Sequence, residues 1–285
     1  MLKIFVSTAV WMSLMYSSSI FAEGQSRASS PVPTKVNFAE IGGYKMYYER
    51  HGQGRPLVLL HGGGSTIKSS FENQLAFFSA NHEIIAIEQV GHGHTRDFGN
   101  EFSYFQMADD TALLLRSLKI MAADFVGWSD GGILALLIAR RHPELVRRVV
   151  ASGANTRLVG MTSEEIKKIQ SSTPSQLAEE LGNDARDEYI SVSPDGAAHW
   201  PIVAKKLWDL WLTPVILDSD DLGKISAPVL IISGDSDLIP VEHAVEIFKA
   251  LPNGKLLVVP GTRHHTFKDA ASIVNPIIMS FINAP

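Results

Sequence analysis

The segment Gly127–Gly131, which reads GWSDG, is the part of the chain whose residue types and spacing could most directly do chemistry. It follows the short apolar run Phe125–Val126 and precedes the almost wholly apolar run Ile133–Ala139. A strand, a tight turn and a helix in this order form a nucleophile elbow, in which the turn raises a serine hydroxyl above a sheet at the positive end of the helix. We therefore predict that Ser129 is a nucleophile; the alternative is a glycine-rich surface turn.

A serine hydroxyl needs a general base, and two later loops supply candidates. One apolar run is followed by Asp235 and Asp237, and the next is followed by His264 and His265. The order serine, acid, histidine is that of a catalytic triad built around a nucleophile elbow. Because neighbouring residues on a loop point in different directions, only one aspartate and one histidine can complete the triad.

The stretch His61–Gly64 (HGGG), after the apolar run Leu57–Leu60, is a candidate for binding the oxyanion that forms during acyl transfer. Such an anion needs fixed donors, and we predict the backbone N–H groups of Gly63 and Asp130. A phosphate-binding loop is the alternative, which the sequence excludes because no G-K-[ST] follows.

His92 and His94, with Asp97 nearby, raise the alternative of a metal site. A hydrolytic metal site normally needs a third ligand and supporting carboxylates, and the chain has no H-x-H-x-D-H arrangement. We predict a structural glycine loop near the active site, with no metal ion and no other cofactor.

The elements that must position these residues alternate between short apolar runs and helical patterns, which is typical of an α/β fold with a mostly parallel, doubly wound sheet. In such sheets the loops after the strands meet at the carboxyl edge, so we expect the candidate residues to lie together there. Ahead of this pattern, Lys35–Ile41 and Tyr44–Arg50 predict an antiparallel hairpin around Gly42-Gly43. The predicted parallel strands contain Leu57–Leu60, Ile84–Ile87, Phe125–Val126, Val146–Ala151, Val229–Ile232 and Leu256–Val259, and the predicted helices contain Ser69–Ser79, Tyr104–Leu118, Ile133–Ala139, Val241–Ala250 and Ala270–Ile282.

The segment 156–222 interrupts the alternation with a mostly helical pattern. Loops above about 12–15 residues are usually structured or functional. We therefore predict an inserted helical lid at 156–222, over a core made of residues 35–155 and 223–285. Two ordinary crossover helices with long loops are the alternative. The segment contains the charge-rich stretches Ser163–Lys168 and Gln176–Leu181 and the tryptophans Trp200, Trp208 and Trp211, which we expect in the lid core and the pocket wall.

Composition limits the remaining possibilities. The chain has 285 residues, a formal net charge of −5 and no strongly basic run, so nucleic acid is not an expected partner. It has no cysteine, which excludes disulfides, thiolate metal sites and a cysteine nucleophile. We expect a small-molecule ester or lactone as the partner, and the oligomeric state stays open.

The first residues are typical of an export signal. Ile4–Tyr16 is apolar but shorter than the roughly 20 residues that a membrane span needs, and Ala22 ends an acceptable cleavage site. We predict a signal peptide at 1–22 and a flexible leader at 23–34, with an uncleaved anchor as the alternative. Export without disulfides suggests a bacterial periplasm or secretion, without stable membrane insertion.

Together these residues resemble the α/β-hydrolase superfamily over essentially the whole mature chain. Residues 127–143 and Ala151–Asn155 are similar to the biphenyl-hydrolase-like and valacyclovir-hydrolase branch. The resemblance implies that Asp237 is the acid and His264 the base. The stretch Glu88–Thr95 (EQVGHGHT) departs from the family's D-x-R-G-x-G-x-S and lacks its arginine, and in this it resembles bacterial serine esterases with diverse substrates.

The resemblance implies a serine hydrolase that cleaves carboxylic esters through an acyl-enzyme, with Ser129, His264 and Asp237 as the catalytic residues. Trp128 and Asp130 are the expected substrate-binding residues. The Asp130 carboxylate would attract a substrate ammonium group, or would instead face solvent or cap the next helix. A lactonase, including a macrocyclic-lactone esterase, is the nearest alternative; a metallohydrolase and a non-catalytic ligand-binding protein of this fold are the others.

Overall fold

The computed structural model of the chain describes residues 35–173, 176, 179 and 182–285. The predicted signal peptide 1–22, the predicted leader 23–34 and part of the stretch Gln176–Leu181 lie outside the described residues. Within the described ranges, no helix combines the length and the apolar character that crossing a bilayer requires.

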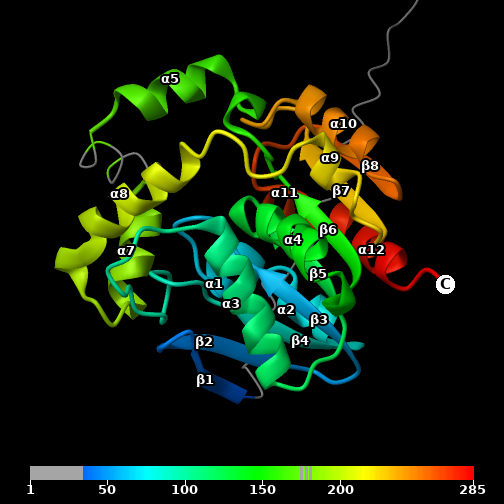
Figure 1. Ribbon diagram of the computed structural model, residues 1–285, viewed down its shortest axis with the longest axis horizontal. Helices are drawn as coiled ribbons and strands as arrows, with labels where there is room; N and C mark the ends of the chain where they lie inside the picture. Colours follow the sequence, from blue (N-terminus) through cyan, green and yellow to red (C-terminus); the bar gives the residue numbers. More distant parts are fainter. Residues whose placement is uncertain (1–34, 174–175, 177–178, 180–181) are drawn as a thin grey trace, which may run out of the picture.

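An eight-stranded sheet runs through the described part of the chain in the order β1-β2-β4-β3-β5-β6-β7-β8 (Figure 1). The strands from β3 to β8 run parallel to one another, whereas β2 pairs antiparallel with both β1 and β4. The predicted mostly parallel sheet with an antiparallel hairpin is therefore confirmed. The strands are β1 (Lys35–Ile41), β2 (Tyr44–His51), β3 (Arg55–Leu60), β4 (His82–Ile87), β5 (Ala123–Trp128), β6 (Val146–Ser152), β7 (Val229–Gly234) and β8 (Gly254–Val259).

The central strands are buried because helices cover both faces of the sheet, as their continuous apolar runs predict. Leu57–Leu60 of β3 lies fully buried beside Ile84–Ile87 of β4. At the edge of the sheet, β1 is exposed over most of its length. The strand interiors are mostly apolar, although Asp124 lies fully buried within β5.

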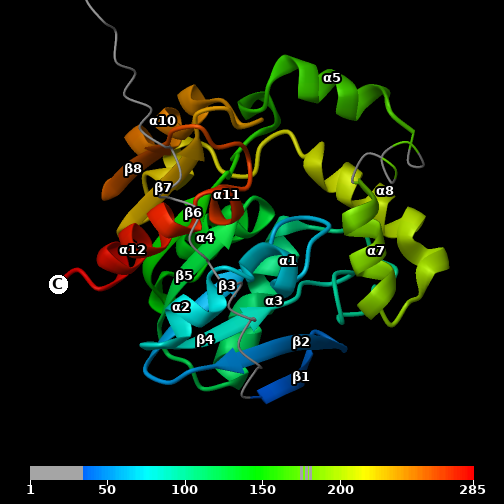
Figure 2. The same cartoon turned by 180° about the vertical axis from the view of Figure 1, so that it is seen from behind.

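One face of the sheet is covered by α3 (Tyr104–Ser117), α4 (Asp130–Arg141) and α10 (Val241–Ala250), as Figure 1 shows. The other face, seen in Figure 2, is covered by α1 (Ile67–Phe71), α2 (Leu75–Ser79), α11 (Thr266–Asp269) and α12 (Ala271–Ile282), and a 3₁₀ turn, η1 (Pro143–Leu145), leads into β6. The buried apolar side chains accordingly form two main clusters, one on each face of the sheet.

The prediction of one continuous helix over Ser69–Ser79 is wrong, because the chain forms two short helices there. The break spans Glu72–Gln74, and the side-chain amide of Gln74 turns inward. It donates to the carbonyl oxygen of Phe267 at 2.7 Å and to Asn275 Oδ1 at 3.0 Å. These buried bonds reach across to α11 and α12 and hold the Gln74 side chain at the break.

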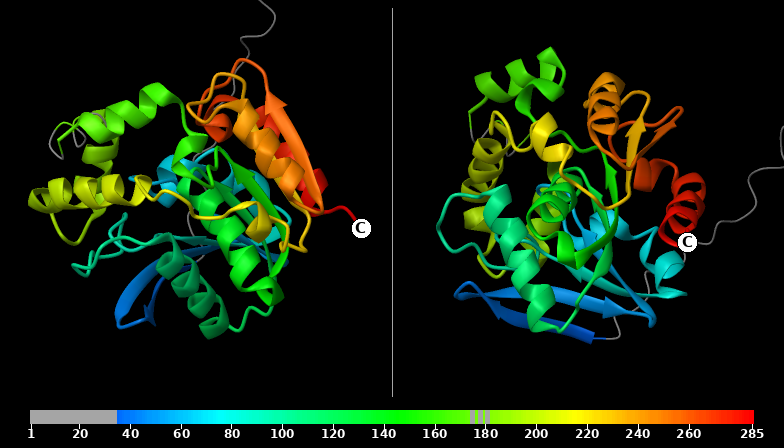
Figure 3. Two further views of the ribbon diagram at one scale, coloured as in Figure 1. Left: turned by 45° about the horizontal axis from the view of Figure 1, so that its top comes forward. Right: turned by 45° about the vertical axis from the view of Figure 1, so that its right-hand side comes forward.

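Between β6 and β7 the chain forms a series of helices that join Thr156 to Leu222. Figures 1 and 3 show α5, α7 and α8 standing apart from the layers that cover the sheet. The last helix, α9, returns to pack against α4 and α10. The boundaries of a lid at 156–222 and of the core segments stay predictions. The elements are η2 (Leu158–Gly160), α5 (Ser163–Ser171), α7 (Gly182–Val192), η3 (Ala197–His199), α8 (Trp200–Trp211) and α9 (Ser219–Leu222).

Candidate active site

Ser129 lies on the sharp turn between β5 and α4, as the elbow pattern predicts. Its backbone φ of 53° falls in a region that residues other than glycine rarely adopt. Its N–H donates to the carbonyl oxygen of Ser152 at 2.7 Å, which ties the turn to the neighbouring strand. Gly131 must lack a side chain because an added Cβ would lie 1.9 Å from the carbonyl oxygen of Leu60. The turn is thus held by main-chain contacts on both sides of β5.

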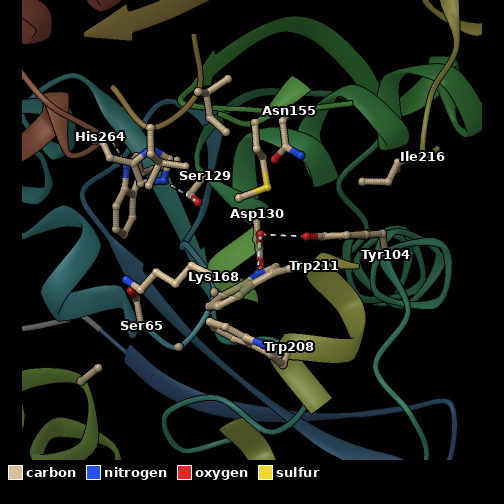
Figure 4. Close-up of a pocket in the computed structure, with 17 residues that line it drawn as sticks. Ser65, Tyr104, Ser129, Asp130, Asn155, Lys168, Trp208, Trp211, Ile216 and His264 are labelled. Carbon is tan, nitrogen blue, oxygen red and sulfur yellow. Dashed lines mark hydrogen bonds between the residues drawn. The ribbon is translucent and has the colours of Figure 1, made fainter. Parts of the chain in front are cut away.

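His264 and Asp237 lie beside Ser129, on the loops that follow β8 and β7. His264 Nε2 is 2.9 Å from Ser129 Oγ, and His264 Nδ1 is 2.7 Å from Asp237 Oδ1 (Figure 4). Asp237 Oδ1 also accepts the Ile239 N–H at 2.9 Å, and the Asp237 side chain is fully buried. With Nδ1–H donating to the carboxylate, Nε2 is left as the acceptor for the serine proton.

The neighbouring candidates, Asp235 and His265, are engaged elsewhere. The Asp235 carboxylate accepts the N–H of Gly261 at 2.9 Å. The His265 ring stacks on Trp128 with centroids 3.8 Å apart, and burial lowers the pKa of His265 to about 4. Of the two pairs that the residues alone left open, the structure brings Asp237 and His264 to Ser129.

Trp128 lines the cavity beside Ser129, and it also holds the histidine loop. Its indole N–H donates to the carbonyl oxygen of His264 at 2.9 Å, while its ring covers His265. The residue predicted to bind substrate therefore fixes the loop that carries His264 as well.

The glycine loop after β3 faces the same cavity. Gly63 and Asp130 both line it together with Ser129, and neither backbone N–H donates a hydrogen bond to another described residue. These two N–H groups face the cavity without such a partner, and their role as oxyanion donors stays a prediction. His61 supports the loop: its Nδ1–H donates to the carbonyl oxygen of Gly62 at 2.8 Å and its Nε2 accepts the Gln89 N–H at 3.0 Å. Burial lowers the pKa of His61 to about 3, which keeps the ring neutral.

The Asp130 carboxylate neither faces solvent nor caps α4, so that alternative is wrong. The residue is 8% exposed, and its carboxylate points into the cavity region. There it accepts the Tyr104 hydroxyl at 2.8 Å and the Trp211 indole N–H at 3.0 and 3.2 Å (Figure 4). Burial raises the pKa of Asp130 above its ordinary value, although the hydrogen bonds from Trp211 and Tyr104 act in the opposite direction.

The cavity over Ser129 has a volume of about 300 Å³. Trp208 and Trp211 of α8 form part of its wall, with their ring centroids 5.2 Å apart. Trp200 packs instead against Tyr189. The wall that faces Ser129 is largely apolar, with contributions from Met161, Ile216, Leu238 and Ile239, and it also includes Asn155 and Lys168 (Figure 4).

His92 and His94 point to different partners. The His92 Nδ1–H donates to the carbonyl oxygen of Val90 at 2.9 Å, and its ring lies against His61. His94 Nδ1 lies 2.9 Å from a carboxylate oxygen of Glu88. Across the described residues, no three histidine, aspartate or glutamate side chains gather as a metal-binding group. These histidines belong to the packing of the loop after β4.

The chain is similar to known proteins both in sequence and in structure. Residues 57–275 match the sequence model of the alpha/beta hydrolase family. The chain is 27% identical to the human serine hydrolase BPHL over 87% of each chain, and 25% identical to a non-heme haloperoxidase from Rhodococcus erythropolis over 85% of this chain and 97% of the other. The solved structure of Est816, an enzyme described as degrading N-acyl homoserine lactones, superposes with a TM-score of 0.71 at 24% identity, covering 86% of this chain and all of that one.

Proposed function

Because the chain belongs to the alpha/beta hydrolase family, we propose that it is a serine hydrolase that cleaves carboxylic esters without a cofactor. The observation that carries the proposal is the continuous contact from Ser129 Oγ through the His264 ring to Asp237. This is the arrangement that turns a serine hydroxyl into a nucleophile near neutral pH. The human relative, itself named a serine hydrolase, supports the same chemistry.

In the first half of the reaction, Ser129 Oγ attacks the ester carbonyl carbon and its proton passes to His264 Nε2. The carbonyl oxygen becomes an oxyanion, which the N–H groups of Gly63 and Asp130 stabilise. Asp237 holds the imidazole ring and stabilises the positive charge that it acquires. His264 then returns the proton to the departing alcohol, which leaves an acyl group on Ser129.

In the second half, water takes the place of the alcohol. His264 Nε2 accepts a proton from this water while its oxygen attacks the acyl carbon, and the oxyanion forms again at the same two N–H groups. Collapse of this intermediate returns the proton to Ser129 Oγ and releases the carboxylic acid. In both halves of the reaction, every proton therefore passes through His264 Nε2.

The cavity size favours compact substrates. A volume of about 300 Å³ is at the small end of ordinary ligand pockets, which span roughly 300–1,000 Å³. Small lactones are esters and fit the same machinery, and a relative in structure, Est816, is described as a lactone-degrading enzyme. A macrocyclic lactone would require the 156–222 helices to move away from Ser129.

The test is a substrate screen of the purified protein. The panel holds p-nitrophenyl esters of increasing acyl length, small lactones and one macrocyclic lactone, with Ser129→Ala as the control. We expect the short esters to be turned over, Ser129→Ala to lose activity by several orders of magnitude, and a phosphonate to label Ser129. Retained activity in Ser129→Ala, or loss of activity with a chelator but not with the phosphonate, would overturn the proposal.

A further inference from the structure

The Asp130 carboxylate is where two parts of the molecule meet the nucleophile turn. Tyr104 reaches it from the first turn of α3, and Trp211 reaches it from the last turn of α8. Asp130 is the residue directly after Ser129, and its N–H is one of the two proposed oxyanion donors. One carboxylate therefore connects the sheet-covering layer, the 156–222 segment and the nucleophile turn.

The second oxyanion donor touches the same carboxylate and the same indole. A Cβ added to Gly63 would lie 2.3 Å from Asp130 Oδ2 and 2.9 Å from the Trp211 ring. The backbone of Gly63 thus packs directly on both groups, without a side chain between them. If the Trp211 indole moves, the Gly63 peptide therefore loses or changes a packing contact.

The bonds to Asp130 are also costly to lose. Its partners are a hydroxyl and an indole N–H, and a buried carboxylate that loses a donor bears a desolvation penalty. Burial already raises the pKa of Asp130 against the effect of these donors. The carboxylate, the indole and the Tyr104 hydroxyl therefore hold one another in a defined arrangement.

We propose that Trp211 is a positioning residue for the oxyanion hole, which it orders through the Asp130 carboxylate and through its contact with Gly63. In this arrangement the 156–222 segment completes the catalytic geometry as well as forming a wall. The inference rests on the proposed serine mechanism. It also gives Asp130 a structural task in every turnover, whether or not the substrate carries a positive charge.

The experiment compares Trp211→Phe with Trp208→Phe on a neutral p-nitrophenyl ester. Phenylalanine keeps an aromatic wall but removes the N–H donor. Trp208 lines the same cavity on the same helix, whereas the indole bonds to Asp130 come from Trp211. Because a direct oxyanion donor is worth about 10²–10³ in kcat, we expect an indirect one to be worth about tenfold in kcat, with KM changed less than twofold. Trp208→Phe should change mainly KM.

A double-mutant cycle shows whether Trp211 acts through Asp130. In an Asp130→Asn background, Trp211→Phe should cost much less than its tenfold effect in the native background, since the shared acceptor is already altered. Tyr104→Phe removes the other donor from the core side and should lower kcat about threefold. It keeps the inference testable if Trp211→Phe does not fold, which thermal unfolding reports.

Three results would overturn the inference: equal, KM-only effects of the two tryptophan variants; an undiminished Trp211→Phe effect in the Asp130→Asn background; or an Asp130→Asn variant that loses only amino-acid ester turnover. The last result would make Asp130 a receptor for a substrate ammonium group. Phosphonate labelling of Ser129 in the unsubstituted protein is measured alongside. Absent labelling and absent ester turnover there would count against the serine mechanism itself, whereas normal labelling with any of the three results counts against Trp211 alone.

Discussion

The core and the 156–222 segment both face the cavity, but different interactions hold them. In the core, β5 pairs with β3 on one side and with β6 on the other, so main-chain bonds fix the elbow. Helix α8, which stands apart from the sheet layers in Figure 3, is tied to the core through side chains such as Lys206 and Trp211. Backbone ladders leave little freedom of geometry, whereas side-chain bonds can be exchanged one residue at a time. The comparison indicates that main-chain bonds fix the position of Ser129, whereas the contribution of α8 to the cavity depends on a few side-chain bonds.

The largest effect should come from breaking the core arrangement at Asp237. Asp237→Asn keeps the size of the side chain but no longer favours the Nδ1–H tautomer of His264, so we expect kcat to fall by about 10⁴-fold. Asp235→Asn is the matched control two residues away, because Asp235 bonds to the Gly261 N–H instead. Its activity should stay within twofold. Steady-state kinetics on one short ester decides between the two, and comparable losses in both variants would contradict the assignment of Asp237.

The attachment of α8 can be broken at Lys206. This ammonium is buried and lies 2.7 and 2.8 Å from the oxygens of Asp97, which also lies 2.7 Å from His199 Nε2. Burial raises the pKa of Asp97, but the bonds from Lys206 and His199 outweigh it and hold that pKa below its usual value. Lys206→Met would leave the carboxylate without its main counter-charge, at a cost of about 3 kcal/mol.

Chemical denaturation and hydrogen exchange over residues 200–211 measure that cost. We expect faster exchange in α8 together with a rise in KM and a fall in kcat, because α8 forms part of the cavity wall and carries Trp211. Lys205→Met is the control, since the neighbouring lysine is exposed and pairs with Asp209 on the surface. Exchange that is equally slow in Lys206→Met and the unsubstituted protein would remove the distinction between side-chain and main-chain attachment.

A substitution at Gly63 should disturb the core and the 156–222 segment together. An alanine there would place its Cβ against Asp130 and Trp211, so one or more of the three must move. We expect kcat to fall by about 100-fold, similar to the loss of an oxyanion donor. Gly223→Ala, at the end of α9, is the control because its φ of −62° suits alanine and the nearest atom lies 3.3 Å away. A Gly63→Ala variant with native kcat would show that this loop does not hold the oxyanion.

Local pattern was sufficient to predict the sheet and the elbow. Each parallel strand contains a short apolar run, and the elbow residues lie within five positions of one another, so both signals are contained in a short window. The choice of Asp237 and His264 over their neighbours needed the family resemblance. Adjacent loop residues differ in direction, and no composition rule gives that direction.

Partners far apart in the chain could not be predicted. The donors to Asp130 lie 26 and 81 residues away, at Tyr104 and Trp211. The side-chain bonds at the break in the expected Ser69–Ser79 helix join Gln74 to residues 193 and 201 positions further on. A buried polar side chain such as Gln74 at an otherwise apolar helix position was the available signal. It indicates that a partner is needed and does not identify the partner.

The smallest effect should appear in the dependence of stability on pH, to which the buried histidines of the core contribute. Burial lowers the pKa of His265 to about 4, as it does for His92, and lowers the pKa of His61 to about 3. A lowered folded-state pKa means that protons bind more readily to the unfolded chain. The associated stability is complete above the ordinary value of about 6.5 and is lost as the pH falls toward 4. At pH 5 the cost is roughly 2 kcal/mol for each such histidine.

His265→Phe keeps a ring on Trp128 and removes the titration, so the variant should lose about 2 kcal/mol less free energy of unfolding than the unsubstituted protein between pH 7 and pH 5, as measured by urea denaturation.

His94 should behave in the opposite way. Its bond to Glu88 raises its pKa despite partial burial, so the stability that it adds is complete below about 6.5 and is lost as the pH rises through the raised value. His94→Gln should therefore lose more stability on acidification than the unsubstituted protein. If the stability of the two variants changed in parallel with pH, the surroundings of these two rings in the folded core would not set their protonation states.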